Sequence, residues 1–290
     1  MNTNRSPKLS ALGLEFAAMA LVLFTLVNCN GGKMEMDNTA NKVTLSSIGD
    51  VPAEAWQKLS QKKIYFGHQS VGYNMLNGIK DVINENPQIK LDIVETADPA
   101  QLNRPILAHS RVGRNSEPVS KTRAFADNMD KGIGEKADVA FFKFCYVDID
   151  PKTDVSKVFR DYRDTMETLR TRYPKTVFIH VTTPLTVKRS GLVGAAKRLL
   201  GRPEGNIKRD EFNQLLRQAY LNKEPLFDLA LVESTFQDGR RSLFEDQGKI
   251  YPSLVPQYTD DDGHLNARGR RVVAEQLLIF LARYSDKRTD

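Results

Sequence analysis

Short apolar runs rich in β-branched and aromatic residues alternate along this chain with longer segments of helical period. Alternation of this kind is typical of βαβ units, in which crossover helices join parallel strands. We therefore predict an α/β fold, a three-layer α/β/α sandwich with a parallel sheet of about five strands and helices on both faces. The predicted strands lie within 63–67, 90–95, 138–147, 175–184 and 226–234, and the clearest helices span 71–83, 155–173, 209–221 and 267–284.

The first 52 residues break this alternation and differ in composition. Arg5 and Lys8 precede an apolar stretch at 16–27, and a cysteine follows it at position 29. The stretch is shorter than the roughly 20 residues that span a bilayer, so export followed by cleavage is the preferred interpretation. The sequence thus predicts a signal peptide over 1–28, a polar flexible tether over 29–52 and one folded domain over 53–290.

The end of this leader, LVNC at 26–29, resembles the lipobox of bacterial lipoproteins. The resemblance implies that Cys29 becomes the lipidated first residue of the mature protein. It also implies that the protein is exported and anchored at the periplasmic or cell-surface side of a membrane. Asn28 stands where that motif usually has Ala, Gly or Ser, so a plain signal peptide and a retained anchor are the alternatives.

Charge and cysteine content weigh against several classes of function. The formal charge is +6, from 42 basic and 36 acidic residues, and no basic stripe interleaved with aromatic residues accompanies it, so we expect no nucleic-acid partner.

Cys145 would be the one thiol of the mature chain, which excludes an internal disulfide. No His-x-x-x-His or paired-cysteine motif is present, and we predict neither a metal nor another cofactor. The combination of His68, His109 and Asp148 is the alternative metal site.

Two polar clusters lie next to predicted strand or helix ends, where ligands of parallel sheets bind. In YFGHQSVGYN (65–74), Ser70 follows the first strand, either as a nucleophile or as the N-cap of the next helix. In DDDGH (260–264), Asp261 precedes His264 by three residues, so that the carboxylate can hold Nδ1–H of the imidazole and leave Nε2 as a base. The alternative for DDDGH is an acidic turn that favours the following helix N-terminus.

A serine after the first strand together with Asp-x-x-His before the last helix resembles the arrangement in the SGNH (GDSL-like) hydrolases, over about 53–284. The resemblance implies a flavodoxin-like fold of SGNH type, with Ser70 as nucleophile, His264 as base and Asp261 as the residue that orients the base. GHQS (67–70) matches the Gly and Ser of the family's Gly-Asp-Ser block, with one residue inserted and without the Asp.

The same resemblance implies an oxyanion hole built from Ser70 and Gly113, with Asn115 two residues beyond that glycine. In the family's Gly-x-Asn-Asp block, the stretch KFCYVDID (143–150) has Val147 where Asn is usual. Valine cannot donate a hydrogen bond, and loss of one oxyanion donor costs on the order of 100- to 1000-fold in rate. The candidate replacements are Tyr146, Asn115 and Gln69.

Further polar residues are candidates for contact with substrate, namely His68, Gln69, His109, Tyr146 and Asp148. Cys145 is a second candidate nucleophile, although buried cysteines more often behave as small apolar residues. We expect His180 to lie in the core. We expect the basic stretch 187–213 to be a solvated face, with attraction of an anionic glycan or lipid headgroup as the alternative.

The residues and the resemblance together predict an extracytoplasmic serine esterase of SGNH type. A carbohydrate O-acyl ester as substrate comes from the resemblance alone. The alternatives are a non-catalytic glycan- or ligand-binding protein on the same scaffold and an acyltransferase with the same triad. The expected partners are a small-molecule or glycan ester and, through the lipid, a membrane, whereas the sequence does not indicate an oligomeric state.

Overall fold

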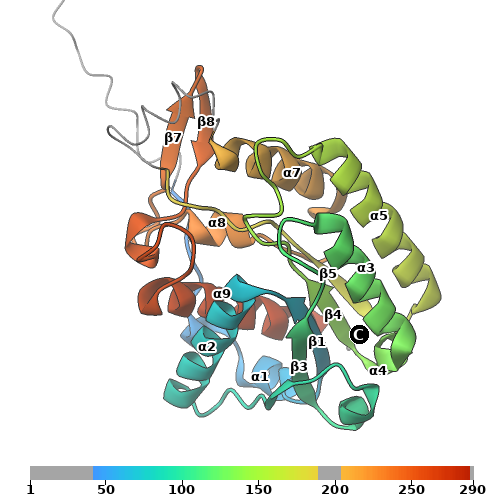
Figure 1. The fold of residues 1–290 in the computed structure, drawn as a ribbon. Helices are drawn as coiled ribbons and strands as arrows, with labels where there is room; N and C mark the ends of the chain where they lie inside the picture. Colours follow the sequence, from blue (N-terminus) through green and yellow to red (C-terminus); the bar gives the residue numbers. More distant parts are fainter. Residues whose placement is uncertain (1–41, 189–203, 288–290) are drawn as a thin grey trace, which may run out of the picture. The chain divides into compact units, whose positions relative to one another are not determined.

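The computed structural model describes residues 42–188 and 204–287, and Figure 1 draws their fold. The predicted signal peptide and Cys29 lie outside these residues. Among these residues, no α-helix combines the length and the hydropathy that a membrane span requires. The strands are β1 Lys63–His68, β2 Ile93–Glu95, β3 Ile106–Arg111, β4 Val139–Phe142, β5 Val177–Val181, β6 Leu226–Phe227, β7 Leu243–Asp246 and β8 Lys249–Pro252. The α-helices are α1 Ala53–Leu59, α2 Ser70–Glu85, α3 Pro118–Asn128, α4 Gly134–Lys136, α5 Val155–Arg172, α7 Gly205–Tyr220, α8 Leu229–Glu233 and α9 Ala267–Lys287.

Six strands form one parallel sheet in the order β2-β3-β1-β4-β5-β6. Without β2 at its edge this is the flavodoxin-like order, in which the chain first moves to one side of β1 and later returns to the other. The register places Gly67, near the end of β1, opposite Ser110 of β3 and Phe142 of β4. The predicted α/β/α architecture with a parallel sheet is confirmed.

The strand assignment differs from the prediction in detail. The prediction omits β3 because its sequence, ILAHSR, carries His109 and Ser110 among few apolar residues and is not followed by an obvious helical period. The predicted strand 226–234 is instead the two-residue β6 followed by α8. Asp228 starts that helix, because its side chain accepts a hydrogen bond from the Leu231 N–H. The observed sheet therefore has six strands instead of about five.

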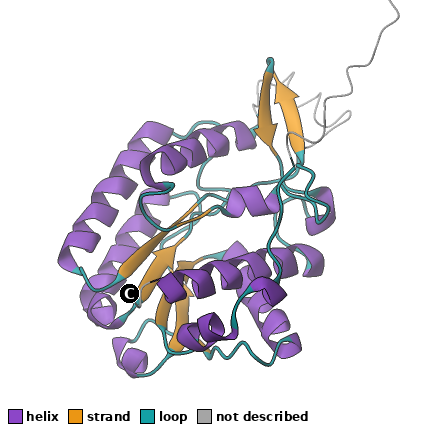
Figure 2. Ribbon diagram, turned by 180° about the vertical axis from the view of Figure 1, so that it is seen from behind, coloured by secondary structure: helices purple, strands orange, loops and turns teal. Residues whose placement is uncertain are grey.

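Side chains alternate between the two faces of the sheet and build two hydrophobic cores. Ile64 and Phe66 of β1 belong to the core covered by α1, α2, α8 and α9, whereas Tyr65 belongs to the core beneath α3, α5 and α7. Figure 2 shows the helices on the two sides of the strands. Both faces of the sheet are thus buried, which leaves its carboxyl edge as the place for chemistry.

The residues that precede α1 pack on the folded domain. The Val43 N–H donates to Gly239 O over 2.9 Å. The Ser46 N–H donates to Gln276 Oε1 of α9, and Gln276 Nε2 donates back to Ser46 O. Val51 is buried. The described end of the predicted tether, residues 42–52, is therefore held against the domain.

An antiparallel hairpin, β7–β8, lies outside the parallel sheet and was not predicted from the sequence. Gln247 and Gly248 form its two-residue turn with φ of 49° and 75°. Positive φ at both positions is what a type I′ turn requires, and Gly at the second supplies it without strain. In Figure 1 the hairpin stands beyond the carboxyl edge of the sheet, near α7 and α8.

Candidate active site

β1 lies between β3 and β4, and the loops that follow these three strands meet at the carboxyl edge of the sheet (Figure 1). Ligands of open α/β sheets bind outside this edge, where the strand order reverses. Ser70, the first residue of α2, follows β1 at this point. Loop 112–117 from β3 flanks it on one side and loop 143–149 from β4 on the other.

Ser70, His264 and Asp261 form a continuous chain of hydrogen bonds. His264 Nε2 lies 3.0 Å from Ser70 Oγ, and His264 Nδ1 lies 2.7 Å from Asp261 Oδ2. A carboxylate only accepts hydrogen bonds, so Nδ1 carries a proton and the lone pair of Nε2 faces the serine hydroxyl. The structure therefore brings the three predicted triad residues together as hydroxyl, base and orienting carboxylate.

The Asp261 carboxylate also shapes the turn that carries His264. Its Oδ1 accepts hydrogen bonds from the backbone N–H groups of Gly263 (3.0 Å) and His264 (2.7 Å). Burial raises the pKa of Asp261, but these bonds and the one from the imidazole lower it by more, so its pKa lies well below the ordinary value. The side chains of His264 and Asp261 are 38% and 56% exposed, so the triad is open to water.

The alternative role of Ser70 as a helix cap is wrong. Gln69, in an extended conformation, is the N-cap of α2, and Ser70 is the first helical residue. The Ser70 hydroxyl instead contacts His264, from the turn before α9. The first N–H groups of a helix have no acceptor within it, and the helix dipole places partial positive charge there. The Ser70 N–H is therefore placed to donate to an anion at this edge.

Gly113 occupies a position that only glycine fits. Its φ is +57°, and an added Cβ would stand 2.5 Å from the backbone N of Lys121. The Gln69 side chain ties this turn to the start of α2, because its Nε2 donates to Val112 O (3.1 Å) and Gly113 O (2.8 Å). These bonds use both amide hydrogens of Gln69. Gln69 thus holds the loop, which does not favour its predicted roles as oxyanion donor or substrate contact.

Asn115 is exposed in the same loop, and a buried lysine holds its amide. Lys121 Nζ donates to Asn115 Oδ1 over 2.9 Å and to Asp148 Oδ2 over 2.5 Å. Asp148 also accepts the backbone N–H groups of Ser116 and Cys145. Because Asp148 is buried and its oxygens are engaged, the structure does not support the predicted contact between Asp148 and substrate.

Tyr146 lies against His264. Their rings meet edge to face with centroids 5.6 Å apart, and the Tyr146 hydroxyl is 3.4 Å from His264 Nδ1. Burial raises the pKa of Tyr146, so its hydroxyl is neutral. Buried Arg209 donates from Nε to Tyr146 O over 2.8 Å, so this residue of the predicted basic face instead supports the loop. Val147 is half-buried and supplies no side-chain donor.

His68 and His109 form a buried pair, His68 at the end of β1 and His109 within β3. His68 Nδ1 lies 3.0 Å from the carbonyl oxygen of Gln69, which only accepts, so Nδ1 carries the proton. His68 Nε2 then accepts from His109 Nδ1 over 3.0 Å. Burial lowers the pKa of both imidazoles, that of His68 to about 3. The pair fixes the backbone before Ser70, and its burial does not support the predicted contact with substrate.

The two other candidate residues, Cys145 and His180, are buried and make no hydrogen bond to the triad. Cys145 is buried, with Lys143 Nζ 3.5 Å from its Sγ, as expected of a small core residue. His180 is buried in β5 and stacks on Tyr220, as the sequence predicted. In the described part of the chain, no group of three or more His, Cys, Asp or Glu side chains could hold a metal ion. Residues 189–203 of the basic stretch lie outside the described residues.

Sequence reasoning missed Lys121, which contacts both Asn115 and Asp148. Lysine is almost never fully buried, so its residue type gives no warning of this role. The available signal is its place on α3, four residues before Phe125, which is buried in the core. Residues four apart share one face of a helix, so Lys121 lies on the apolar stripe.

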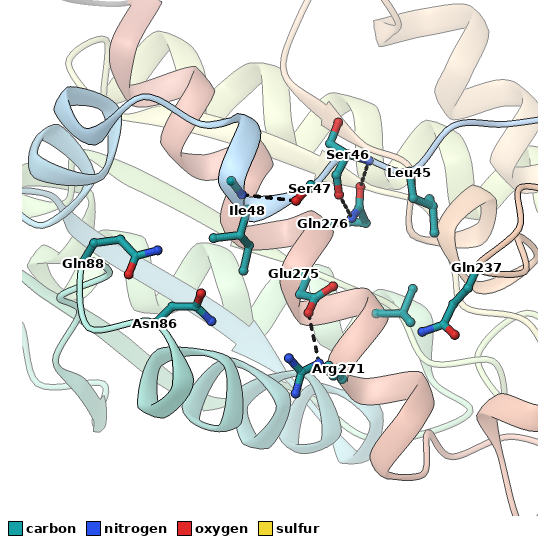
Figure 3. A pocket seen from close by; sticks show the side chains of 12 residues that line it. Leu45, Ser46, Ser47, Ile48, Asn86, Gln88, Gln237, Arg271, Glu275 and Gln276 are labelled. Atoms are coloured by element: carbon teal, nitrogen blue, oxygen red, sulfur yellow. Dashed lines mark hydrogen bonds and ion pairs between the residues drawn. The ribbon is translucent and has the colours of Figure 1, made fainter.

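A pocket of about 440 Å³ lies between segment 45–49, the end of α2 and α9 (Figure 3). Its labelled side chains are mostly polar, and Gln276 is hydrogen-bonded to Ser46 there. Asn86 lines it and follows the last residue of α2, whereas Ser70 begins that helix. Sixteen helical residues span about 24 Å. The pocket is therefore separate from the triad.

No family model and no curated protein matches this chain. Similar solved structures include a family 3 carbohydrate esterase from Talaromyces cellulolyticus, with 14% identity and a TM-score of 0.47 over 78% of this chain and 99% of that one. They also include a protein of the G-D-S-L family from Desulfitobacterium hafniense DCB-2, with 10% identity and a TM-score of 0.43 over 76% of this chain and 99% of that one. A third is the periplasmic domain of a lipopolysaccharide acetyltransferase from Salmonella ser. Paratyphi A, with 14% identity and a TM-score of 0.44 over 75% of this chain and 83% of that one. At these identities the likeness concerns the fold alone.

Proposed function

We propose that this protein is a serine esterase of SGNH type in which Ser70 is the nucleophile, His264 the general base and Asp261 the residue that orients the base. The supporting observation is the chain of hydrogen bonds from Ser70 Oγ to His264 Nε2 (3.0 Å) and from His264 Nδ1 to Asp261 (2.7 Å). A hydrogen bond between partly exposed side chains adds little to stability. Chemistry therefore explains the alignment better than folding does.

The reaction proceeds through an acyl-enzyme. Ser70 Oγ forms a bond to the ester carbonyl carbon while His264 Nε2 takes the hydroxyl proton and the carbonyl π pair moves onto oxygen. When that pair returns, the bond to the leaving oxygen breaks, and this oxygen takes the proton from His264 and departs as an alcohol. Water then attacks acyl-Ser70 in the same way, His264 returns the proton to Ser70 Oγ, and the acid leaves. Asp261 stays ionised and stabilises the imidazolium.

The oxyanion of each tetrahedral intermediate accepts hydrogen bonds from the N–H groups of Ser70 and Gly113 and from Asn115 Nδ2. Ser70 supplies the N–H of a helix start, and the Gly113 loop flanks it. Asn115 is exposed, and its oxygen faces Lys121, so its N–H₂ group is the free end. Asn115 thereby replaces the donor that Val147 cannot supply.

The substrate we propose is an O-acyl ester of a carbohydrate, outside the cytoplasm. The motif resemblance supports this class, and so does the exposure of His264 and Asp261, because an open site admits an ester carried on a polymer. We further propose that a lipid on Cys29 tethers the enzyme to a membrane. Cys29→Ser should move the mature protein from the detergent phase to the aqueous phase in Triton X-114 partitioning, and unchanged partitioning would remove the lipid anchor from the proposal.

Hydrolysis is favoured over acyl transfer because water reaches the half-exposed triad directly. A transferase would instead deliver the acyl group to an added alcohol. With p-nitrophenyl acetate as the acyl donor, the yields of free acetate and of acetylated monosaccharide, measured at increasing concentrations of the monosaccharide, separate the two activities. Acetate as the main product throughout supports hydrolysis.

Labelling with a fluorophosphonate probe tests the serine mechanism against a non-catalytic binding role. Wild-type protein should be labelled on Ser70, and Ser70→Ala and His264→Ala should not be labelled. Ser60→Ala is the matched control, because Ser60 precedes β1 at the amino edge of the sheet. Equal labelling of wild type and Ser70→Ala, or no labelling of folded wild type, would contradict the proposal.

A further inference from the structure

We propose that the buried pair Lys121–Asp148 is a positioning device that fixes the side-chain amide of Asn115 with its N–H₂ group toward the oxyanion. The inference rests on the proposed function and deepens it, because it explains how this chain can work with Val147 in place of a donor. Lys121 and Asp148 act through Asn115 and touch no reacting atom. They are therefore positioning residues.

The contacts of Asn115 fix the orientation of its amide. The two ends of an asparagine amide have nearly the same shape, so its contacts decide which end faces the site. An ammonium group has three hydrogens and no acceptor, so the Asn115 atom that lies 2.9 Å from Lys121 Nζ is the oxygen. Nδ2, on the same planar group, then points away from Lys121. Asn115 is exposed, so both hydrogens of Nδ2 are available at the surface of the loop.

Lys121 is itself held rigidly by its burial and its ion pair. Its side chain and that of Asp148 are both fully buried, and Nζ lies 2.5 Å from Asp148 Oδ2. Asp148 is held in turn by the N–H of Cys145 at 2.5 Å and, through Oδ1, by the N–H of Ser116 at 2.8 Å. Ser116 has φ of +64°, an unfavourable value for a residue with a side chain, and its bond to Asp148 helps hold it there. The amide of Asn115 is thus attached to a fixed frame.

The ion pair joins segments that follow two different strands. Lys121 and Asn115 belong to the segment after β3, and Asp148 belongs to the loop after β4. These two strands flank β1, which leads into Ser70. Neighbouring strands lie about 4.8 Å apart, so a contact between α3, which follows β3, and the loop after β4 bridges about 10 Å across the end of β1. The ion pair therefore links the segment that carries Asn115 to the loop after β4, on either side of the strand that leads into Ser70.

A buried ion pair is weak evidence for a role in stability. Desolvation of both charges offsets much of their attraction, and apolar replacements of such pairs are often neutral or stabilising. At Lys121 an apolar residue would complete the stripe shared with Phe125. Lys121 makes two contacts that an apolar side chain could not make, the ion pair with Asp148 and the hydrogen bond to Asn115 Oδ1, and the second of these reaches the loop that follows β3.

Steady-state kinetics on p-nitrophenyl acetate test this role. Asn115→Ala should lower kcat on the order of 100-fold with little change in KM, because the donor acts in the transition state. Lys121→Met has a similar length and no donor, and it should lower kcat by a comparable factor. Adding it to Asn115→Ala should cause no further loss, since it acts through that amide. Asn115→Asp keeps an oxygen for Lys121 but presents an acceptor to the oxyanion, so it should lose at least as much as Asn115→Ala.

Two further variants keep the test decisive. If Lys121→Met does not fold, the double variant Lys121→Met with Asp148→Asn removes both charges and should show the same loss of kcat. Lys143→Met is the matched control, because Lys143 is also a buried lysine but contacts Phe144 O and Cys145 Sγ instead of Asn115. If Lys143→Met lowers kcat, the double variant with Asn115→Ala should show the product of the two single fold-losses, as expected for residues that act independently.

An NMR measurement separates failure of this inference from failure of the proposed function. The two Nδ2 hydrogens of Asn115, assigned from their absence in Asn115→Ala, should be ordered in wild type and mobile in Lys121→Met. Ordered hydrogens in Lys121→Met, unchanged kcat in that variant, or multiplying effects of Lys121→Met and Asn115→Ala would each overturn the inference. Activity that persists in Ser70→Ala would instead overturn the serine mechanism, and the NMR signal would still decide whether Lys121 fixes the amide.

Discussion

Ser70 Oγ and His264 Nε2 lie 3.0 Å apart although 194 residues separate them in the sequence. Ser70 reaches this position as the first residue of α2, and His264 reaches it on the turn before α9. The two helices pack on the same face of the sheet. Their mutual packing therefore sets the distance between the proposed nucleophile and its base.

Removal of the triad side chains should show that they act as one unit. Ser70→Ala and His264→Ala should each lower kcat for p-nitrophenyl acetate on the order of 10⁴- to 10⁶-fold, and the double variant should lose no more than either single one. Asp261→Asn should retain somewhat more activity, because it misorients the imidazole without removing it. Thermal unfolding of all variants serves as the control. Losses in Ser70→Ala and His264→Ala that multiply would mean that the two residues act independently.

Gly78→Ala should disturb this alignment from a distance. Gly78 lies in α2 so close to α9 that an added Cβ would stand 2.2 Å from the carbonyl oxygen of Arg270. The helices would have to separate, which should lower the free energy of unfolding by about 1 to 3 kcal/mol. Because α9 directly follows the turn that carries His264, kcat should fall as well. Asn77→Ala, at an exposed position of α2, is the control and should change neither quantity. Full activity of Gly78→Ala would mean that the turn keeps its place without the helix contact.

Val147→Asn tests whether the oxyanion donor has moved to Asn115. With Asn115 present, a second amide at position 147 should change kcat by less than about threefold. In the Asn115→Ala background, the same substitution should restore part of the lost activity, because it returns a donor to the loop after β4. Val147→Ala in that background is the control and should restore nothing. A large gain from Val147→Asn in the otherwise unchanged protein would show that Asn115 does not fill the role.

Local spacing explains what the sequence could predict of this site. Asp261 and His264 are three residues apart, so one turn brings them together without help from the rest of the fold. The apolar residues of β1 predict the strand that precedes Ser70. In a parallel sheet, a residue that follows a strand lies at the carboxyl edge, where ligands bind. The prediction that Ser70 and His264 act together rested in addition on the resemblance to the SGNH hydrolases, because these two local features do not by themselves bring the ends of the chain together.

Contacts between neighbouring strands and loops explain what the sequence could not predict. The pairing of His68 with His109 depends on the register of β1 and β3, and β3 was not recognised. The burial of Lys121 and Asp148 depends on α3, which follows β3, meeting the loop after β4 across the end of β1. Residue type alone suggests exposed charge at both positions. Such positions become interpretable only once the order of the strands is known.

Acid and base should both destabilise the fold, through different buried groups. Burial lowers the pKa of His68 to about 3 and that of His180 to about 4, from an ordinary 6.5. Between each lowered pKa and 6.5, the unfolded chain binds more protons at these histidines than the folded protein does. The free energy of unfolding therefore falls as the pH falls below about 6.5. Burial raises the pKa of Glu233 from 4.5 to about 8, so the folded protein keeps a proton that the unfolded chain has lost. This group makes the free energy of unfolding fall as the pH rises toward 8.

Glu233→Gln isolates the second effect. Glu233 Oε2 accepts the Leu185 N–H over 2.7 Å, and its Oε1 has no partner among the described residues. Glutamine matches the shape of the protonated acid and can accept the same N–H, but it does not titrate. Chemical denaturation should show wild type losing up to about 1.4 kcal/mol per pH unit between pH 6.5 and 8 from this group, and Glu233→Gln should lose that slope. Glu245→Gln, at an exposed position, is the control and should keep the wild-type slope. An unchanged slope in Glu233→Gln would mean that Glu233 is ionised in the folded protein, with buried Lys143 or Arg209 as the compensating charge.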